Sequence, residues 1–300
     1  MPDSSTSRPL VTVGLTVHNE PIEVLYDAVK SVYAQTLEDW ELVIARDGVT
    51  DEIQAALDKL ADPRVRVIGD DQNLGVGVRH NQITADARGT FIAKLDGDDI
   101  MFPERLATQV AFLTDRPDNA VVGTGALIID QFNEVRGERT AVRPHNKPAD
   151  ALSGVPVTHP TAMARTSWFE AHPYDEALIR SQDFGLWISS YNDTEFFNID
   201  DPLLFYRITA PMKYNRFARR YKYARQAIRK LGNNVATTTE LAKAWALTWV
   251  KQAGAAAGFA TGKQDAFYNR TLVPLSEPEL DQAQQILQVI ARTEVPGWSQ

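Results

Sequence analysis

The 300-residue sequence contains no cysteine. Without thiols the chain has no disulfide framework, no cysteine nucleophile and no zinc site built on sulfur. This composition agrees with a reducing compartment, and we expect a cytoplasmic protein. Long hydrophobic runs are also missing, since no stretch approaches the roughly 20 apolar residues that span a bilayer. The opening residues MPDSSTSRPL lack a basic stretch followed by an apolar segment, so no secretory signal is expected.

Positive charge is in the minority, with 31 Lys and Arg against 39 Asp and Glu and a formal net charge of -8. This balance argues against a nucleic-acid-binding surface over the whole chain, and we expect no nucleic-acid partner. Cations nevertheless dominate from Pro202 to Thr239, where no acid occurs. In segment 213–230 aromatic residues alternate with these cations. The pattern predicts either contact with an anionic membrane surface or a solvated helix packed across the acidic body.

Short β-rich runs alternate with helical patterns up to about Asp130. The runs at 11–17, 41–45, 64–69 and 90–95 predict four strands, and apolar residues spaced three and four apart predict helices between and after them. This order predicts an α/β fold in which helices flank a mostly parallel central sheet.

The second half of the chain is less regular. Strands are predicted at 120–130 and 134–143, a helix at 181–191, and two short strands at 195–199 and 203–208. From Tyr214 onward the chain is predicted to be helical. In that region the apolar stretch 244–260 is interrupted by Lys251 and Gln252, which favours a packing helix over a membrane span.

Polar side chains follow three of the predicted strands at their carboxyl ends, where parallel sheets form their binding crevice. The first strand is followed by HNE, the second by RDG and the fourth by DGDD. Mg²⁺ and Mn²⁺ prefer oxygen ligands, so Asp96 and Asp98 are candidate metal ligands, with an Asp/Gly-rich turn as the alternative. Asp47 either reads a base or ribose or forms only a turn.

Three further side chains are candidates for chemistry. Arg79, after the loop NLGVGV, either contacts a diphosphate or is an exposed helical arginine; the loop fails the dinucleotide fingerprint because His80 replaces its third glycine. Asp183, beside an apolar helical face, is a general base or a carboxylate that favours a helix N-terminus. His159 binds a metal, orients an acceptor or is structural.

Seven segments occur in an order that is characteristic as a set: LTVHNE, QTLEDWELVIARDGVTD, NLGVGVRHN, FIAKLDGDDIMFPERL, VTHPTAMAR, SQDFGLW and PLLFYR. Together they resemble family 2 glycosyltransferases of the GT-A fold, over about residues 9 to 207. The resemblance implies a domain at 1–212, with a nucleotide-binding half at about 9–130 and an acceptor half at about 131–212. A helical C-terminal region would follow at 213–300.

The resemblance also implies a nucleotide-diphosphate sugar as donor, with uridine as the expected base. The residues that would bind this donor are Thr16, Glu20, Asp47, Arg79 and Asp96, with Asp47 on the base and Arg79 near the diphosphate.

At the DxD motif of the family, Asp98 would bind Mn²⁺ or Mg²⁺ directly, with Asp96 between ribose and metal. Asp183 matches the catalytic base of inverting members, and His159, Gln182 and Trp187 would lie near the acceptor or the metal. The chain departs from the family pattern at Arg46 and Val49, which concern base recognition, and at Gln182, which concerns the orientation of Asp183.

These features predict a metal-dependent inverting glycosyltransferase that acts on a saccharide or lipid-linked acceptor in polysaccharide or glycolipid assembly, peripheral on the inner membrane face if the basic segment binds lipid. A sugar nucleotidyltransferase is one alternative, but it would need a glycine-rich triphosphate loop after the first strand, where LTVHNE stands. A non-catalytic nucleotide- or glycan-binding protein on the same fold is the other. A nicotinamide-dependent dehydrogenase is disfavoured by the failed glycine pattern.

Overall fold

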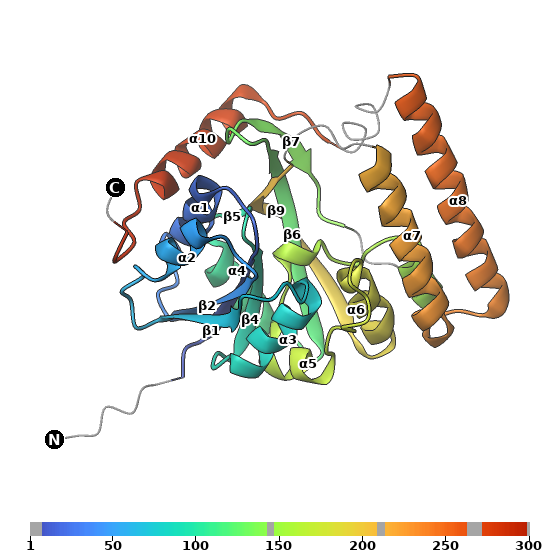
Figure 1. Ribbon diagram of the computed structural model, residues 1–300, viewed down its shortest axis with the longest axis horizontal. Coiled ribbons are helices and arrows are strands. Elements are labelled where there is room, and N and C mark those ends of the chain that lie inside the picture. The colour runs from blue at the N-terminus through green and yellow to red at the C-terminus, as the bar shows by residue number, and fades with distance from the viewer. Residues whose placement is uncertain (1–7, 143–146, 209–213, 263–271, 299–300) are drawn as a thin grey trace.

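A nine-stranded sheet forms the centre of the computed structural model, which describes residues 8–142, 147–208, 214–262 and 272–298 (Figure 1). The strands lie in the order β3-β2-β1-β4-β8-β6-β9-β5, and β7 pairs with β6. The predicted α/β fold with helices flanking a mostly parallel sheet is therefore confirmed.

The four strands predicted in the first half are present and parallel to one another: β1 (Val11–Val17), β2 (Trp40–Asp47), β3 (Val65–Asp70) and β4 (Phe91–Asp96). Every residue of β1 is buried, as expected for a strand covered on both faces. The connecting helices are α1 (Ile22–Tyr33), α2 (Asp51–Leu57), α3 (Val76–Asp86) and α4 (Arg105–Thr114). Because the strands are parallel, their carboxyl ends meet at one edge of the sheet.

Different helices cover the two faces of this sheet. On one face, side chains of α1, α2 and α4 form a common core with alternate residues of β1 and β4. On the other face, the sheet is covered by α3, α5 (Thr166–Ala171) and α6 (Gln182–Ser190). Gly14 permits the close approach of α3, because a Cβ at that position would lie 2.7 Å from Cγ2 of Ile83. Alternate residues of β4, including Lys94 and Asp96, point to the α3–α6 side.

The second half of the sheet is mixed. Short β8 (Met163–Arg165) runs antiparallel between β4 and β6 (Ala120–Ile129), and β5 (Ile100–Met101) and β7 (Val135–Arg139) are antiparallel additions. The two short strands predicted at 195–199 and 203–208 are instead one strand, β9 (Glu195–Arg207), parallel to β6. Its register shifts where Ile199 pairs with Thr124 but Pro202 pairs with Gly125. Asp200 and Asp201 fill this irregularity, which interrupts the hydrophobic pattern without ending the pairing.

Beyond the sheet, α7 (Tyr214–Leu231) and α8 (Thr238–Ala260) pack against each other, and α8 forms the outer edge of the molecule at the right of Figure 1. A capping box between Thr237 and Glu240 begins α8. Within the described residues, no helix combines the length and apolar character needed to cross a bilayer. Single-turn 3-10 helices complete the structure at Pro148–Leu152, His159–Thr161, Tyr191–Asp193 and Gly232–Asn234.

The C-terminal segment returns to the N-terminal half. Helix α10 (Glu277–Ala291) lies along α1, and the Lys30 ammonium donates to the carbonyl of Ala291 at 2.7 Å. The Trp298 indole packs on Tyr26 with the ring centroids 4.5 Å apart and the planes inclined by 46°, and it donates from Nε1 to the Ala56 carbonyl at 2.6 Å. Val295 and Trp298 thus pack into the core of the first half, whereas α10 belongs to the helical C-terminal region predicted at 213–300.

Candidate active site

Carboxylates from three distant segments meet at the carboxyl end of β4. Asp96 ends that strand, Asp98 follows in the next turn, Glu20 lies in the loop after β1, and Asp183 lies in the first turn of α6. Burial, together with repulsion from Asp98, Asp183 and Glu20, raises the pKa of Asp96 to about 7. These four carboxylates therefore form one electrostatically unfavourable group in the absence of a cation.

Three of the acids on the turn after β4 are close enough to share a metal ion. Ligand oxygens of Asp96, Asp98 and Asp99 lie within 4.8 Å of one another. Asp99 is almost fully buried, and its pKa is raised well above the usual value by burial and by repulsion from Asp98 and Asp96. An all-oxygen donor set with excess negative charge fits a hard divalent cation. Asp99 was missed as a candidate, although its DGDD segment was singled out.

Arg207 holds this acidic turn in place. It lies at the end of β9 and is nearly fully buried. Its Nε donates to the Asp98 carbonyl and a terminal nitrogen donates to the Asp130 carbonyl, both at 2.8 Å, while its backbone N–H donates to the Asp99 carboxylate at 2.8 Å. The segment PLLFYR indicated that this strand belongs to the family pattern, but no role for Arg207 followed from it.

Asp47 anchors the loop that precedes α3. Its carboxylate accepts hydrogen bonds from the backbone N–H groups of Leu74 at 2.7 Å and Gly75 at 3.0 Å, and from Nε of Arg79 at 3.0 Å. The side chain lies at the end of β2, where a base or ribose was expected to be read.

Arg79 differs from both expectations. Its side chain is fully buried, so it is not an exposed helical arginine and presents no surface to a diphosphate. Besides Asp47, the guanidinium donates to Asp70 at 2.7 Å and to Gln82 at 2.9 Å. Asp47 lies on β2, Asp70 on β3 and Gln82 on α3. Arg79 therefore fixes the end of β2 to β3 and to α3.

His18 connects Asp47 with the carboxylates around Asp96. Its Nδ1 donates to the Asp47 carbonyl at 2.6 Å, a proton position assigned from the carbonyl partner, and its backbone N–H donates to Glu20 at 2.7 Å. Side-chain amides of Asn19 and Asn73 lie 2.9 and 3.1 Å from Nε2. The segment HNE was noticed in the sequence, but this linking role of His18 was not.

Thr16 lies near the end of β1, almost fully buried and level with Asp96 in the parallel pairing. Thr16 and Asp96, which were both expected to contact the nucleotide sugar, therefore lie on neighbouring strands. This placement leaves the nucleotide-binding role of Thr16 as a prediction that the geometry permits.

A strained residue precedes the proposed base. Ser181 adopts a left-handed conformation with φ of +67° just before α6, a region that costs energy for any residue but glycine. Asp183 is half-buried, and its Oδ1 accepts from the backbone N–H of Phe184 at 2.7 Å. Gln182 lies against Gly77 of α3, and its buried Oε1 has no hydrogen-bond partner among the described residues.

Behind the carboxylates lies a group of basic and aromatic side chains that we call the buried base cluster: His80, Lys94, His159 and Tyr174. His159 Nε2 and the Tyr174 hydroxyl are 2.7 Å apart, and the Lys94 ammonium lies 5.2 Å from the Tyr174 ring. Burial lowers the pKa of His159 to about 4 and that of Lys94 to about 7. Ligand atoms of His80, Asp96 and His159 also lie within 4.8 Å of one another, so His159 is in the neighbourhood of the candidate metal site, as expected.

Trp187 is a core residue. It is fully buried and packs among Trp168, Phe196 and the ring of His159, whose centroid is 6.1 Å away. It was expected near the acceptor or the metal; because no part of it reaches solvent, it can influence either only through the residues packed around it. Its position instead supports His159 from behind.

Comparison with known proteins gives consistent results. Residues 12–172 match the family described as Glycosyl transferase family 2. An uncharacterized glycosyltransferase of Methanocaldococcus jannaschii is 32% identical over 209 residues, covering 67% of this chain and 71% of the relative.

Solved structures share the fold at low sequence identity. The structure of S. aureus TarS 1-349 in complex with UDP superposes with a TM-score of 0.58 at 16% identity, covering 94% of this chain and 89% of that one. The mannosyltransferase PcManGT of Pyrobaculum calidifontis, in complex with GDP-Man and Mn²⁺, superposes with a TM-score of 0.57 at 18% identity, covering 95% and 87%.

Proposed function

The chain belongs to glycosyltransferase family 2, and on that basis we propose that it transfers a sugar, with inversion, from a nucleotide-diphosphate donor to a hydroxyl of a saccharide or lipid-linked acceptor. The observation that carries this proposal is the convergence of Glu20, Asp96, Asp98 and Asp183 from three segments of the chain. Such a group of acids combines a cation site with a proton acceptor.

The donor would bind across the carboxyl ends of β1, β2 and β4. Thr16 and Glu20 would line the nucleotide, and Asp47 would face its base. Uridine remains the base we propose; the UDP complex of TarS and the GDP-Man complex of PcManGT support a nucleotide-diphosphate donor on this fold and leave the choice of base to the donor screen. Arg79 and His18 would act through Asp47, because their hydrogen bonds fix its carboxylate and its carbonyl.

Asp96 and Asp98, with Asp99 beside them, would hold Mn²⁺ or Mg²⁺. Bound there, the cation would neutralise charge on the departing diphosphate, a Lewis-acid contribution of several kcal/mol. The Mn²⁺ in the PcManGT structure supports this choice of metal. Arg207 would keep the acidic turn rigid through its hydrogen bonds to Asp98 and Asp99.

Asp183 would act as general base on the acceptor. Its carboxylate takes the proton of the acceptor hydroxyl while that oxygen forms a bond to the anomeric carbon. The bond from this carbon to the diphosphate oxygen breaks on the opposite face and its electron pair leaves with the diphosphate, which inverts the anomeric centre. A positioned base of this kind contributes about 10²–10⁴-fold in rate.

The two alternative functions make different demands on the site. A sugar nucleotidyltransferase needs backbone N–H groups from a glycine-rich loop after β1, whereas the segment LTVHNE at the end of β1 contains no glycine. A non-catalytic binding protein has no need of Asp183 beside the candidate metal site. The site therefore fits the glycosyltransferase reaction better than either alternative function.

A panel of nucleotide sugars, screened by thermal shift with and without Mn²⁺, tests the proposal. The preferred donor should raise the melting temperature in proportion to the logarithm of its concentration over Kd, and only with Mn²⁺ present. The donor found in this way should then be hydrolysed slowly by the wild type and not by Asp98→Asn. A chain that no nucleotide sugar stabilises and that hydrolyses none of them would refute the proposed activity.

A further inference from the structure

Helix α8 exposes four large apolar side chains along its middle, and the ring of one of them, Trp249, is partly covered by Arg225 of α7. Trp245 and Trp249 are each 46% exposed, Leu247 is 40% exposed and Val250 is 67% exposed. The two indole rings lie one turn apart with their centroids at 5.8 Å. Alanine and glycine make up most of the remaining outward positions toward the end of the helix. Large exposed apolar surfaces of this kind mark interaction sites.

Helix α7, which packs beside α8, presents cations that have no carboxylate partner. Exposed Arg219, Arg220, Lys222 and Arg229 form no ion pair within the described part of the chain, whereas Lys230 pairs with Asp175. No acidic residue occurs anywhere in the α7 sequence. This helix therefore offers a concentrated positive charge on an otherwise acidic protein.

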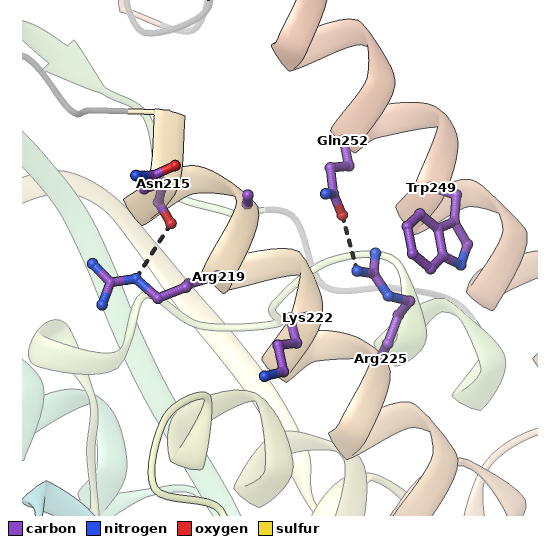
Figure 2. A pocket seen from close by; sticks show the side chains of 7 residues that line it. Asn215, Arg219, Lys222, Arg225, Trp249 and Gln252 are labelled. Carbon is purple, nitrogen blue, oxygen red and sulfur yellow. Dashed lines mark hydrogen bonds between the residues drawn. The ribbon is translucent and has the colours of Figure 1, made fainter.

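A groove between the two helices brings the cations and the aromatic face together (Figure 2). Its volume is about 690 Å³, and Arg219, Lys222, Arg225 and Trp249 are among its lining residues. The Arg225 guanidinium lies 3.7 Å from the centre of the Trp249 ring and donates to Gln252 at 2.9 Å. Arg225 thus ties α7 to α8, while Figure 2 shows Arg219 and Lys222 extending away from α8.

We propose that α7 and α8 form a docking surface for a bilayer that contains anionic phospholipids. Helix α8 lies along the interface with Trp245 and Trp249 at headgroup depth, and Arg219 and Lys222 bind lipid phosphates. The membrane contact predicted for segment 213–230, whose Lys213 lies outside the described residues, thereby extends to a surface made of two helices.

The chemistry favours a lipid surface over a protein partner. Tryptophan is the side chain most suited to the bilayer interface, where its apolar ring and its N–H are both accommodated. Clustered Lys and Arg are attracted to anionic headgroups, and the acidic remainder of the chain is repelled by the same surface, which fixes the orientation. Helix α8 has only Glu240, Lys243 and Lys251 as charged side chains, and beside the cations of α7 it supplies the apolar part of an interfacial amphipathic element.

Docking in this way would place the membrane near the base. Helix α7 packs on α6, whose first turn carries Asp183, through Ala227 and Ile228 against Ile188 and Leu178. A lipid-linked acceptor held at the surface would therefore reach the site over a short path. This consequence rests on the proposed function, whereas the docking itself does not.

Vesicle flotation of the full chain tests the surface without any turnover. We expect binding at low salt to vesicles of phosphatidylcholine with phosphatidylglycerol, little binding to phosphatidylcholine alone, and weakening by added salt. Each cation near an anionic surface strengthens binding about fivefold, so the double variant Arg219→Glu with Lys222→Glu should bind at least about 25-fold more weakly. Trp245→Ser with Trp249→Ser should bind about tenfold more weakly, because interfacial binding scales with buried apolar area.

Two control variants match these changes elsewhere on the surface. Phe132→Ser removes an aromatic ring that is 74% exposed, and Lys59→Glu reverses an exposed charge at the end of α2. Both should float like the wild type, and all variants should be compared at a temperature at which their thermal melts show them folded. Failure of the wild type to float with anionic vesicles overturns the proposal. So does a dimer of the free chain that the Trp double variant dissociates, since the face would then be a subunit interface.

Discussion

Two groups of titratable side chains lie back to back beside β4, and burial acts on them in opposite directions. In front, the pKa of Asp96 is raised by burial and by the neighbouring acids Asp98 and Asp183. Behind, burial lowers the pKa values of His80, Lys94 and His159. In both groups the neutral form is favoured.

The two groups differ in which partners can reach them and stabilise their charged forms. Asp96 and Asp183 are partly open to solvent, so a cation and a substrate hydroxyl can reach them. His80 and Lys94 are fully buried, and burial lowers the pKa of both; for Lys94 burial outweighs the attraction of the nearby Asp96. The difference indicates that the front group is built for partners that come and go, whereas the buried base cluster shapes the site from behind.

The largest effect is expected for Asp183→Asn, which keeps the size of the side chain but removes the proton acceptor. Transfer should fall by about 10³-fold, while stabilisation by the donor in a thermal melt stays close to wild type. Glu170→Gln, which changes an exposed carboxylate on α5, should leave the transfer rate unaltered. Full turnover by Asp183→Asn would show that Asp183 is not the proton acceptor of the reaction.

A second difference should appear in the pH dependence of stability without metal. The folded-state pKa of Asp96, about 7, lies above the unfolded value near 4. The folded chain then holds the extra proton, so the free energy of unfolding falls as pH rises from about 4 to 7.

In the presence of a chelator, Asp96→Asn should melt on the order of a few degrees above the wild type at pH 8, and the gap should close toward pH 4. Mn²⁺ should raise the wild-type melting temperature at pH 8 and have less effect on the variant. If the melting temperatures of the two proteins change with pH in parallel, the pKa of Asp96 is not raised in the folded state.

The base behind should show the opposite slope. The folded-state pKa of His159 is about 4, below its unfolded value near 6.5, so the wild type loses stability as pH falls from about 6.5 to 4. His159→Gln removes this titration and the 2.7 Å contact with Tyr174. The variant should unfold more easily than the wild type by about 1 kcal/mol at pH 7.5, with a difference that shrinks on acidification; a constant difference would contradict the assignment.

The smallest effect is expected where the front group is held by strain. Ser181→Gly removes the left-handed cost of about 1–2 kcal/mol but adds entropy to the unfolded chain, so urea unfolding should show a net gain of about 0.5 kcal/mol. Asn133→Gly changes a residue with a similar φ of +62°, but it also removes the 3.0 Å hydrogen bond from the Asn133 amide to the Asp27 carboxylate. Only Ser181→Gly should therefore gain stability, and it should also lower the transfer rate; an unchanged rate in Ser181→Gly would separate the strain from function.

The sequence was sufficient for the features that are local. Short apolar runs ended by polar clusters predicted β1 to β4 and placed Asp47, Asp96 and Asp98 at one edge, because parallel strands end together. The burial of Arg79 was not predictable in this way. Its partner Asp47 lies 32 residues away, and nothing in a helical period distinguishes an arginine that faces a carboxylate from one that faces water.

Pairing across long distances also escaped prediction elsewhere. The continuity of β9 depends on its partner β6, which tolerates the extra residues at Asp200 and Asp201. Arg207 supports the acidic turn only because β9 brings it next to Asp99, 108 residues earlier. Trp187 was expected near the acceptor or the metal. The helical period shows on which face of the helix a residue lies, but not which other residues cover that face.

The return of the last residues to the first half has a consequence for biosynthesis. Trp298 covers Tyr26 and Ala56, contacts that join residues more than 240 positions apart, so the first half of the sheet is sealed only after residue 298 has left the ribosome. Contacts of such high sequence separation slow folding and leave apolar surface open meanwhile. Nascent chains stalled before residue 277 should therefore be held by chaperones and cut readily by proteases near α1 and α2.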